Sequence, residues 1–126
     1  MDRIVVTEFV SLDGVIKAPG GGEDYRHGGW TFEIERGDEG DKFKLDELVE
    51  AEAQLLGRVT YEGFAAAWPT IEDEGGFAEK MNSMPKYVYS TTLATADWNN
   101  STILSGDFAT DIAAAKDEVE IGRAHV

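Results

Sequence analysis

Apolar and polar positions follow one another along the chain in blocks that predict strands and helices in turn. Residues 3–10 form a nearly continuous apolar run, which is typical of a strand buried on both faces and predicts a central strand of an α/β sheet. Residues 43–53 carry apolar side chains at helical spacing, with acidic side chains outside, and predict a helix. Residues 54–57 then predict a short buried strand that ends at a glycine.

The second half of the chain continues this alternation. It predicts helices at residues 59–68, 76–84 and 111–119, and strands at 87–91 and 102–105. The order of elements predicts an α/β layered sheet without a repeat or an internal domain boundary, and 126 residues suffice for one domain at most. The aromatic residues expected to pack in its core are Tyr61, Phe64, Trp68 and Trp98.

A polar, glycine-rich segment at residues 18–40 interrupts the pattern. Loops longer than about 15 residues in a compact domain are usually functional or mobile, so we expect a substrate-side loop. Trp30 is a candidate for stacking on a planar ring, and packing into the core is the alternative. His27 is suited to proton donation near neutral pH, although a lone loop histidine is more often only solvated.

Composition excludes several classes of function. The chain has 25 acidic residues against 11 Lys and Arg, a net charge of −14, which repels nucleic acids and anionic membranes. It has no cysteine, so disulfides, thiolate metal sites and a cysteine nucleophile are excluded. The acidic residues do not follow a calcium-loop spacing, and no metal site is expected. No apolar stretch approaches the roughly 20 residues that span a bilayer, and the start is not a signal peptide, so we expect a cytoplasmic protein.

The segment from Gly57 to Thr60 carries the clearest chemistry. A predicted strand ends at Gly57, Arg58 follows, and Thr60 lies in the first turn of the next helix. The free N–H groups and the positive dipole of a helix start favour an anion, and an arginine fork is suited to phosphate. The pattern therefore indicates a phosphate-bearing ligand, and a plain strand-to-helix turn with Arg58 on the surface is the alternative.

Four segments in the right order resemble one family. LGRVTYEGF resembles the G-R-x-T-[YW]-E segment of dihydrofolate reductases, and YVYSTTL resembles the strand that follows it in that family. Ser11-Leu12-Asp13-Gly14 resembles the S-L-D-G element of riboflavin-biosynthesis reductase domains, and MNSMPKYV with WNNSTILSGD resembles their stand-alone bacterial branch. The resemblance covers residues 3–119 and implies a three-layer dihydrofolate reductase-like fold, with a central mixed, mostly parallel sheet flanked by helices.

The resemblance also implies a cofactor and positions for it. It implies an NADPH-dependent reductase whose partner is a small, heterocyclic substrate, similar either to an amino-(phosphoribosylamino)uracil or to dihydrofolate. A non-catalytic nucleotide-binding module of the same fold is the alternative. The full-length parent is compatible with a homodimer.

Individual residues carry over position by position. Gly57, Arg58 and Thr60 match cofactor-phosphate contacts, and Ser90 and Thr91 match the strand end beside the 2′-phosphate. Strand-end capping is the alternative for that hydroxyl pair.

Three more residues are substrate-side candidates. Ser11 and Asp13 match positions near the nicotinamide or the substrate, and Trp30 joins them from the glycine-rich loop. Asp13 is the candidate for a catalytic role, with building the turn before Gly14 as its alternative. The acidic residue that dihydrofolate reductases place on their first helix has no certain counterpart here.

The end of the chain departs from the family pattern. Residues 120–126 back-translate, with ordinary codons, to a string that contains the start of a widely used short-read sequencing adaptor. The sequence therefore predicts a partial domain at residues 1–119 and a non-native tail at 120–126 that packs against nothing. A natural C-terminus is the alternative.

The family's second glycine turn and last strands would lie beyond residue 119. The fold is thus expected to be incomplete at its C-terminus. We expect the chain alone to aggregate or unfold partly, to bind NADPH weakly and to show no turnover.

Overall fold

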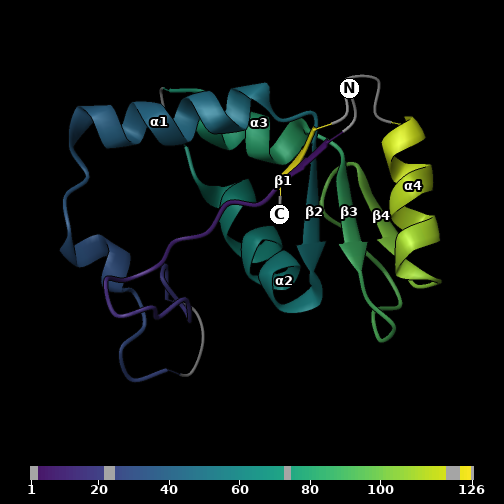
Figure 1. The fold of residues 1–126 in the computed structure, drawn as a ribbon, viewed down its shortest axis with the longest axis horizontal. Coiled ribbons are helices and arrows are strands. Elements are labelled where there is room, and N and C mark those ends of the chain that lie inside the picture. The colour runs from purple at the N-terminus through teal and green to yellow at the C-terminus, as the bar shows by residue number, and fades with distance from the viewer. Residues whose placement is uncertain (1–2, 22–24, 73–74, 119–122, 126) are drawn as a thin grey trace.

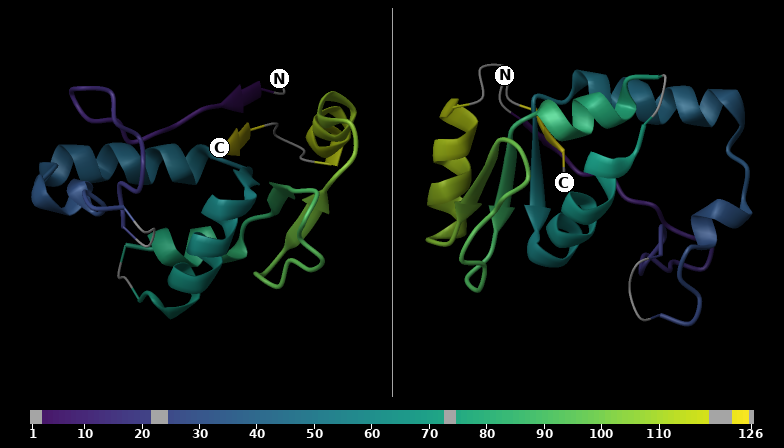
Figure 2. Two further views of the ribbon diagram at one scale, coloured as in Figure 1. Left: turned by 90° about the horizontal axis from the view of Figure 1, so that it is seen from below. Right: turned by 180° about the vertical axis from the view of Figure 1, so that it is seen from behind.

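The computed structural model describes residues 3–21, 25–72, 75–118 and 123–125. They form one five-stranded sheet in the order β1-β5-β2-β3-β4, and every pairing in it is parallel. Helix α4 covers one face of the sheet, and α1, α2 and α3 lie on the other side (Figure 1; Figure 2). The expected three-layer α/β architecture is confirmed.

The elements follow the chain in regular order. The strands are β1 (Arg3–Val5), β2 (Ala53–Gly57), β3 (Lys86–Tyr89), β4 (Ser101–Leu104) and β5 (Arg123–His125). The α-helices are α1 (Gly37–Glu50), α2 (Arg58–Ala67), α3 (Phe77–Ser83) and α4 (Phe108–Glu118), and two short 3-10 helices are η1 (Trp30–Glu33) and η2 (Trp68–Thr70). None of the helices in the described parts of the chain is long and apolar enough to cross a membrane.

Alternate residues of β2 enter two separate apolar clusters, because successive side chains of a strand point to opposite faces. Ala53 and Leu55 pack with Tyr87 and with Ile112 of α4. Leu56 packs on the other face, in a larger cluster. The buried members of that cluster are Leu48, Ala51, Leu56, Tyr61, Met81, Met84, Val88 and Trp98.

The predicted aromatic core is confirmed. Tyr61 and Trp98 are buried, and Phe64 and Trp68 pack against the same cluster while partly exposed.

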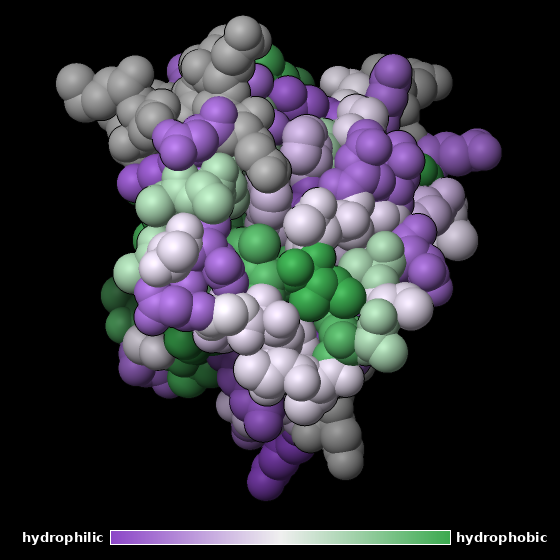
Figure 3. Space-filling model, turned by 90° about the vertical axis from the view of Figure 1, so that its right-hand side faces the viewer, coloured by the Kyte–Doolittle hydropathy of each residue, from purple (hydrophilic) through white to green (hydrophobic). Residues whose placement is uncertain are grey.

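The side of the molecule where α4 and β4 lie carries apolar residues in its middle with polar residues around them (Figure 3). Phe108, the first residue of α4, is half exposed and packs edge-to-face on Tyr89, with ring centroids 5.1 Å apart.

The first strand corrects one expectation. Its apolar run predicts a central strand at residues 3–10, but β1 stops at Val5 and lies at the edge of the described sheet. Val6 and Val10 are exposed, so the apolar run continues beyond the pairing instead of being buried on both faces. A run of apolar residues does not by itself fix which strands lie beside it.

Helix α1 corrects a second expectation, because it begins at Gly37 rather than at residue 43 and ends at Glu50. Gly37 has a φ of 72°, a backbone conformation that favours glycine. Asp38 and Glu39 lie in the first turn, where acidic side chains stabilise a helix through its dipole. The helix therefore starts at Gly37, inside the segment that the sequence assigns to a loop.

The C-terminal tail corrects a third expectation. Arg123, Ala124 and His125 form β5, which pairs with β1 on one side and with β2 on the other. The prediction that the tail packs against nothing is wrong. The non-native origin assigned to residues 120–126 loses this structural support and stays a prediction from the sequence; residues 119–122 and 126 lie outside the described residues.

Candidate functional site

The turn from β2 into α2 has the geometry of an open anion site. Gly57 has an extended backbone, with φ −77° and ψ 168°, and a Cβ placed on it would meet no protein atom within 4 Å. Neither backbone conformation nor crowding by the protein explains a glycine here. No side chain in the described parts of the chain caps α2, and no acidic residue lies in its first turn. The helix start therefore presents unsatisfied N–H groups to solvent.

Arg58 lies at this helix start but is engaged by a neighbour. Its Nη1 is 3.0 Å from Oε2 of Glu62, one turn along α2, and both side chains are about half exposed. Exposed pairs at this spacing contribute only about 0.2–0.5 kcal/mol. A phosphate at the helix start can therefore compete for the guanidinium. Thr60 is exposed in the same turn.

Ser90 and Thr91 follow the neighbouring strand at the same edge of the sheet. Gly57 is in register with Tyr89, so Ser90 comes directly after the residue beside the glycine turn. Ser90 is buried, and its Oγ accepts the backbone N–H groups of Thr92 and Leu93, both at 3.1 Å. That is the geometry of the strand-end capping alternative, whereas Thr91 is exposed. The structure thus brings the two phosphate segments to adjacent strand ends.

Ser11 and Asp13 form a turn of their own. The Ser11 hydroxyl donates to the Asp13 carboxylate and accepts the Val15 N–H at 2.9 Å, and Gly14 N donates to Ser11 O. Gly14 has a φ of 90°, which suits the turn. The arrangement matches the turn-building alternative for Asp13, and its catalytic role stays a prediction.

The glycine-rich loop is closed mainly by contacts within itself. The Trp30 indole donates to the Lys17 carbonyl at 3.1 Å, and Thr31 donates to Pro19. Trp30 is partly buried and is not a member of either core cluster. His27 is exposed and lies edge-on to Tyr25, with ring centroids 5.7 Å apart. Among the described residues, no group of three or more His, Asp or Glu side chains is placed to hold a metal ion.

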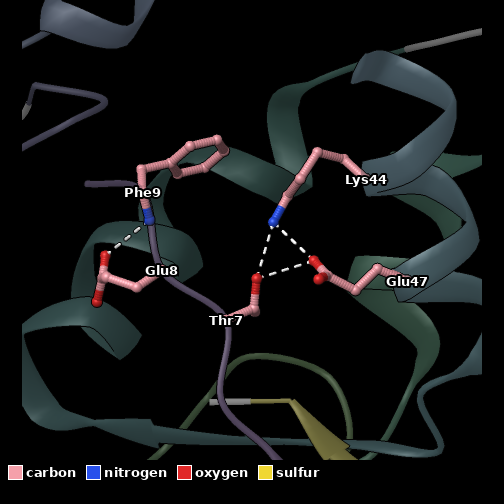
Figure 4. Close-up of polar contacts among 5 residues, drawn as sticks. All are labelled: Thr7, Glu8, Phe9, Lys44 and Glu47. Carbon is pink, nitrogen blue, oxygen red and sulfur yellow. Dashed lines mark hydrogen bonds and ion pairs between the residues drawn. The ribbon is translucent and has the colours of Figure 1, made fainter. Parts of the chain in front are cut away.

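The structure adds a polar cluster that the sequence analysis missed (Figure 4). Lys44 Nζ donates to Glu47 Oε1 at 2.7 Å and to Thr7 Oγ1 at 3.0 Å, and Thr7 donates to Glu47 at 2.9 Å. Both charged side chains are only 18% exposed. Lys44 Nζ also lies 4.7 Å from the centre of the Phe9 ring. The cluster joins α1 to the segment that follows β1.

The sequence contains only a weak signal for this cluster. Lys44 and Glu47 have the i,i+3 spacing of a helix ion pair, but the helical pattern places Glu47 outside. The outward assignment is wrong, because the segment after β1 covers that side of α1. Thr7 lies 37 positions from Lys44 and 40 from Glu47, so this contact leaves no local trace in the sequence.

A second charged group is buried without a carboxylate. Lys86 is fully buried, and its Nζ donates to the carbonyls of Asn82, Met84 and Asn99 at 2.7–2.9 Å. It also lies 4.3 Å from the Trp98 ring. Burial lowers the pKa of Lys86 from 10.5 to about 8. The carbonyls and the ring favour the charged form and so oppose the effect of burial.

Comparison with known proteins places this geometry in a family. Residues 2–122 match the family described as RibD C-terminal domain. A search of curated proteins gave no match. The match includes the Gly57–Thr60 turn, the Ser90–Thr91 strand end and the polar cluster of Thr7, Lys44 and Glu47.

Proposed function

Because the chain belongs to the RibD C-terminal domain family, a family of reductase-type domains of riboflavin biosynthesis, we propose that it is an NADPH-dependent reductase of a small heterocyclic substrate. In this proposal the cofactor supplies the hydride, and the protein supplies binding, orientation and electrostatics. The substrate class is either a ribosylaminopyrimidine or a pterin.

One observation carries the proposal: an uncapped helix start and a hydroxyl pair lie at the carboxyl ends of adjacent parallel strands. Ligands of open α/β sheets bind at that edge, and helix starts bind phosphates. Gly57 fits a close approach of phosphate, since the protein fills none of the space where a side chain would be. Arg58 and Thr60 would then hold cofactor phosphates, with Ser90 and Thr91 beside the 2′-phosphate.

The substrate side is assigned to different residues. Ser11, Asp13 and Trp30 are proposed for it from the resemblance and from their place after β1 and in the glycine-rich loop. The Lys44–Glu47 pair adds a partly buried cation and anion next to Thr7, two residues beyond the end of β1. Such a pair can hydrogen-bond a heterocycle that carries both donors and acceptors.

The test is the substitution Arg58→Ala, followed by calorimetric titration with NADPH and with NADH. Loss of the charged hydrogen bonds is expected to weaken NADPH binding by about 1.5–3 kcal/mol, and NADH binding by less if the 2′-phosphate is reached. Arg36→Ala is the matched control, because Arg36 forms a similar exposed ion pair with Asp41 at 3.1 Å, away from this turn. Equal and small losses for both cofactors would contradict the assignment.

Turnover decides between an enzyme and a nucleotide-binding module. NADPH oxidation by the full-length parent expected from the sequence, measured with pterins, ribosylaminopyrimidines and quinoid compounds, is expected to single out one class. Tight NADPH binding without oxidation by any of these compounds would favour the non-catalytic alternative.

A further inference from the structure

A groove lies beside the proposed phosphate turn and is separate from it. It has a volume of about 710 Å³ and runs between α2 and the segment that joins β3 to β4. None of Gly57, Arg58, Thr60, Ser90 and Thr91 lines it. The lining residues are Tyr61, Glu62, Ala65, Pro69, Asn82, Leu93, Thr95, Asp97, Trp98 and Asn99.

Hydrogen bonds hold the floor of the groove in place. The Tyr61 hydroxyl accepts the Trp98 N–H at 3.0 Å and donates to Ser101 Oγ at 2.9 Å. The Trp98 indole donates to Asn82 Oδ1 at 2.8 Å, and Lys86 holds the Asn99 carbonyl at 2.7 Å. A site whose walls are already fixed orders little on binding, which favours ligand affinity.

The charges of the lining are of one sign. Glu62 and Asp97 are carboxylates, and the lining contains no Lys, Arg or His. Lys86 is fully buried and is not among the lining residues, and its Nζ points to three carbonyls and the Trp98 ring, so it does not face the groove. Ala65, Pro69 and Leu93 add apolar surface. The combination matches a flat apolar body that carries one positive charge.

Glu62 links the groove to the phosphate turn. Glu62 lines the groove, and its carboxylate forms the 3.0 Å ion pair with Arg58. A cation in the groove competes for that carboxylate and releases Arg58 toward a phosphate. The two ligands therefore strengthen each other's binding, as linkage requires.

We propose that this groove is a binding site for a flat organic cation, and that its occupant acts through Glu62 on the affinity of Arg58 for phosphate. The first part is independent of the proposed reductase function. The second part rests on it.

The test of the first part uses benzamidine, a flat cation, and benzamide, its neutral counterpart. Benzamidine is expected to bind with a Kd on the order of 1 mM and to shift the NMR signal of the Trp98 indole N–H, whereas benzamide leaves it unchanged. Glu62→Gln and Asp97→Asn are each expected to weaken binding several-fold. Glu79→Gln, an exposed acid of α3 outside the lining, is the control that changes the net charge by the same amount.

The outcomes separate the two parts. Equal weakening by Glu79→Gln would mean nonspecific attraction to an acidic protein, and equal binding of benzamide would mean that the positive charge is not recognised. Either outcome would overturn the site. Saturating benzamidine is expected to tighten NADPH binding by about two-fold, the factor that corresponds to an exposed i,i+4 pair. Benzamidine binding without this change would overturn the coupling alone. Absence of NADPH binding would count against the reductase function and leave the benzamidine result standing.

Discussion

The sheet with its helices and the N-terminal arm, which we define as residues 6–36, are held by different forces. Residues from Leu48 onward supply every buried member of the two apolar clusters. In the described part of the arm, Leu12 is fully exposed and Phe32 is 80% exposed. Thr7 instead joins the arm to α1 through hydrogen bonds with Lys44 and Glu47, whereas Trp30 bonds Lys17 within the arm itself. Among its described residues only Ala18 is buried, so the arm opens at lower free energy than the sheet.

The two regions are expected to differ most in the stability that is lost when an apolar side chain is shortened. Leu48→Ala removes a fully buried side chain from the larger cluster and is expected to lower the free energy of unfolding by about 2–5 kcal/mol. Leu12→Ala, the matched change in the arm, is expected to alter it by less than about 0.5 kcal/mol. Urea unfolding followed by circular dichroism measures both. Similar losses at the two positions would remove the distinction.

Buried hydrogen bonding gives the next largest effect. Tyr61→Phe leaves the buried Trp98 N–H without its acceptor and is expected to cost about 1–3 kcal/mol of stability. Tyr25→Phe in the arm is the control and is expected to change stability little. The same urea titration measures both variants. An unchanged free energy of unfolding in Tyr61→Phe would show that water replaces the hydroxyl.

The burial of Lys86 in the sheet predicts that the free energy of unfolding depends on pH. Its pKa is about 8 in the folded protein, so between about pH 8 and its ordinary pKa of 10.5 the unfolded chain binds more protons than the folded one. The free energy of unfolding therefore rises with pH in this window, by about 1 kcal/mol from pH 8 to pH 9. Below the window Lys86 is charged in both the folded and the unfolded state, and the full cost of burying the charge applies.

Lys86→Met removes this contribution while leaving other titrations in place. The variant is less stable at all pH values, because three carbonyls lose a donor. The difference between protein and variant is expected to widen from pH 8 to pH 9. Parallel stability curves would show that the folded protein keeps Lys86 protonated throughout.

The smallest expected effect concerns the anchor of the arm. A double-mutant cycle of Lys44→Met and Glu47→Gln is expected to give a coupling energy of about 0.2–1 kcal/mol, as for other partly exposed ion pairs. Cleavage of the arm by a protease should nevertheless accelerate, since the pair holds Thr7. Unchanged cleavage would show that other contacts fix the arm.

The local pattern of apolar and polar residues predicts much of the sheet and its helices well. Strand β2 and its glycine end follow from the buried run and from the turn chemistry, and α2, α3 and the aromatic core follow from helical spacing. The phosphate turn is predictable for the same reason: its strand end and helix start are adjacent in sequence. Its partner strand end, at Ser90, follows because consecutive parallel strands end at one edge.

What the sequence does not predict depends on distant partners. The edge position of β1, the pairing of β5 and the contact of Thr7 with Lys44 and Glu47 each join residues far apart in the chain. Lys86 is similar: nothing in its neighbourhood distinguishes a surface lysine from one enclosed by α3 and the segment before β4. The start of α1 is mispredicted for a different reason. A glycine is typical of a loop, but Gly37, with its positive φ, is the first residue of this helix.

The place of β5 in the sheet sets an order of assembly during synthesis. Among the described strands, β1 is bonded only to β5, and Arg3 lies in register with Arg123. Strands β2, β3 and β4 can pair as soon as Leu104 has left the ribosome, because their ladders use only neighbouring segments. Strand β1, which is made before them, must wait for residues made after α4 before it joins them. Such a long closure slows folding and leaves the apolar N-terminal segment exposed to chaperones and to other chains in the interval.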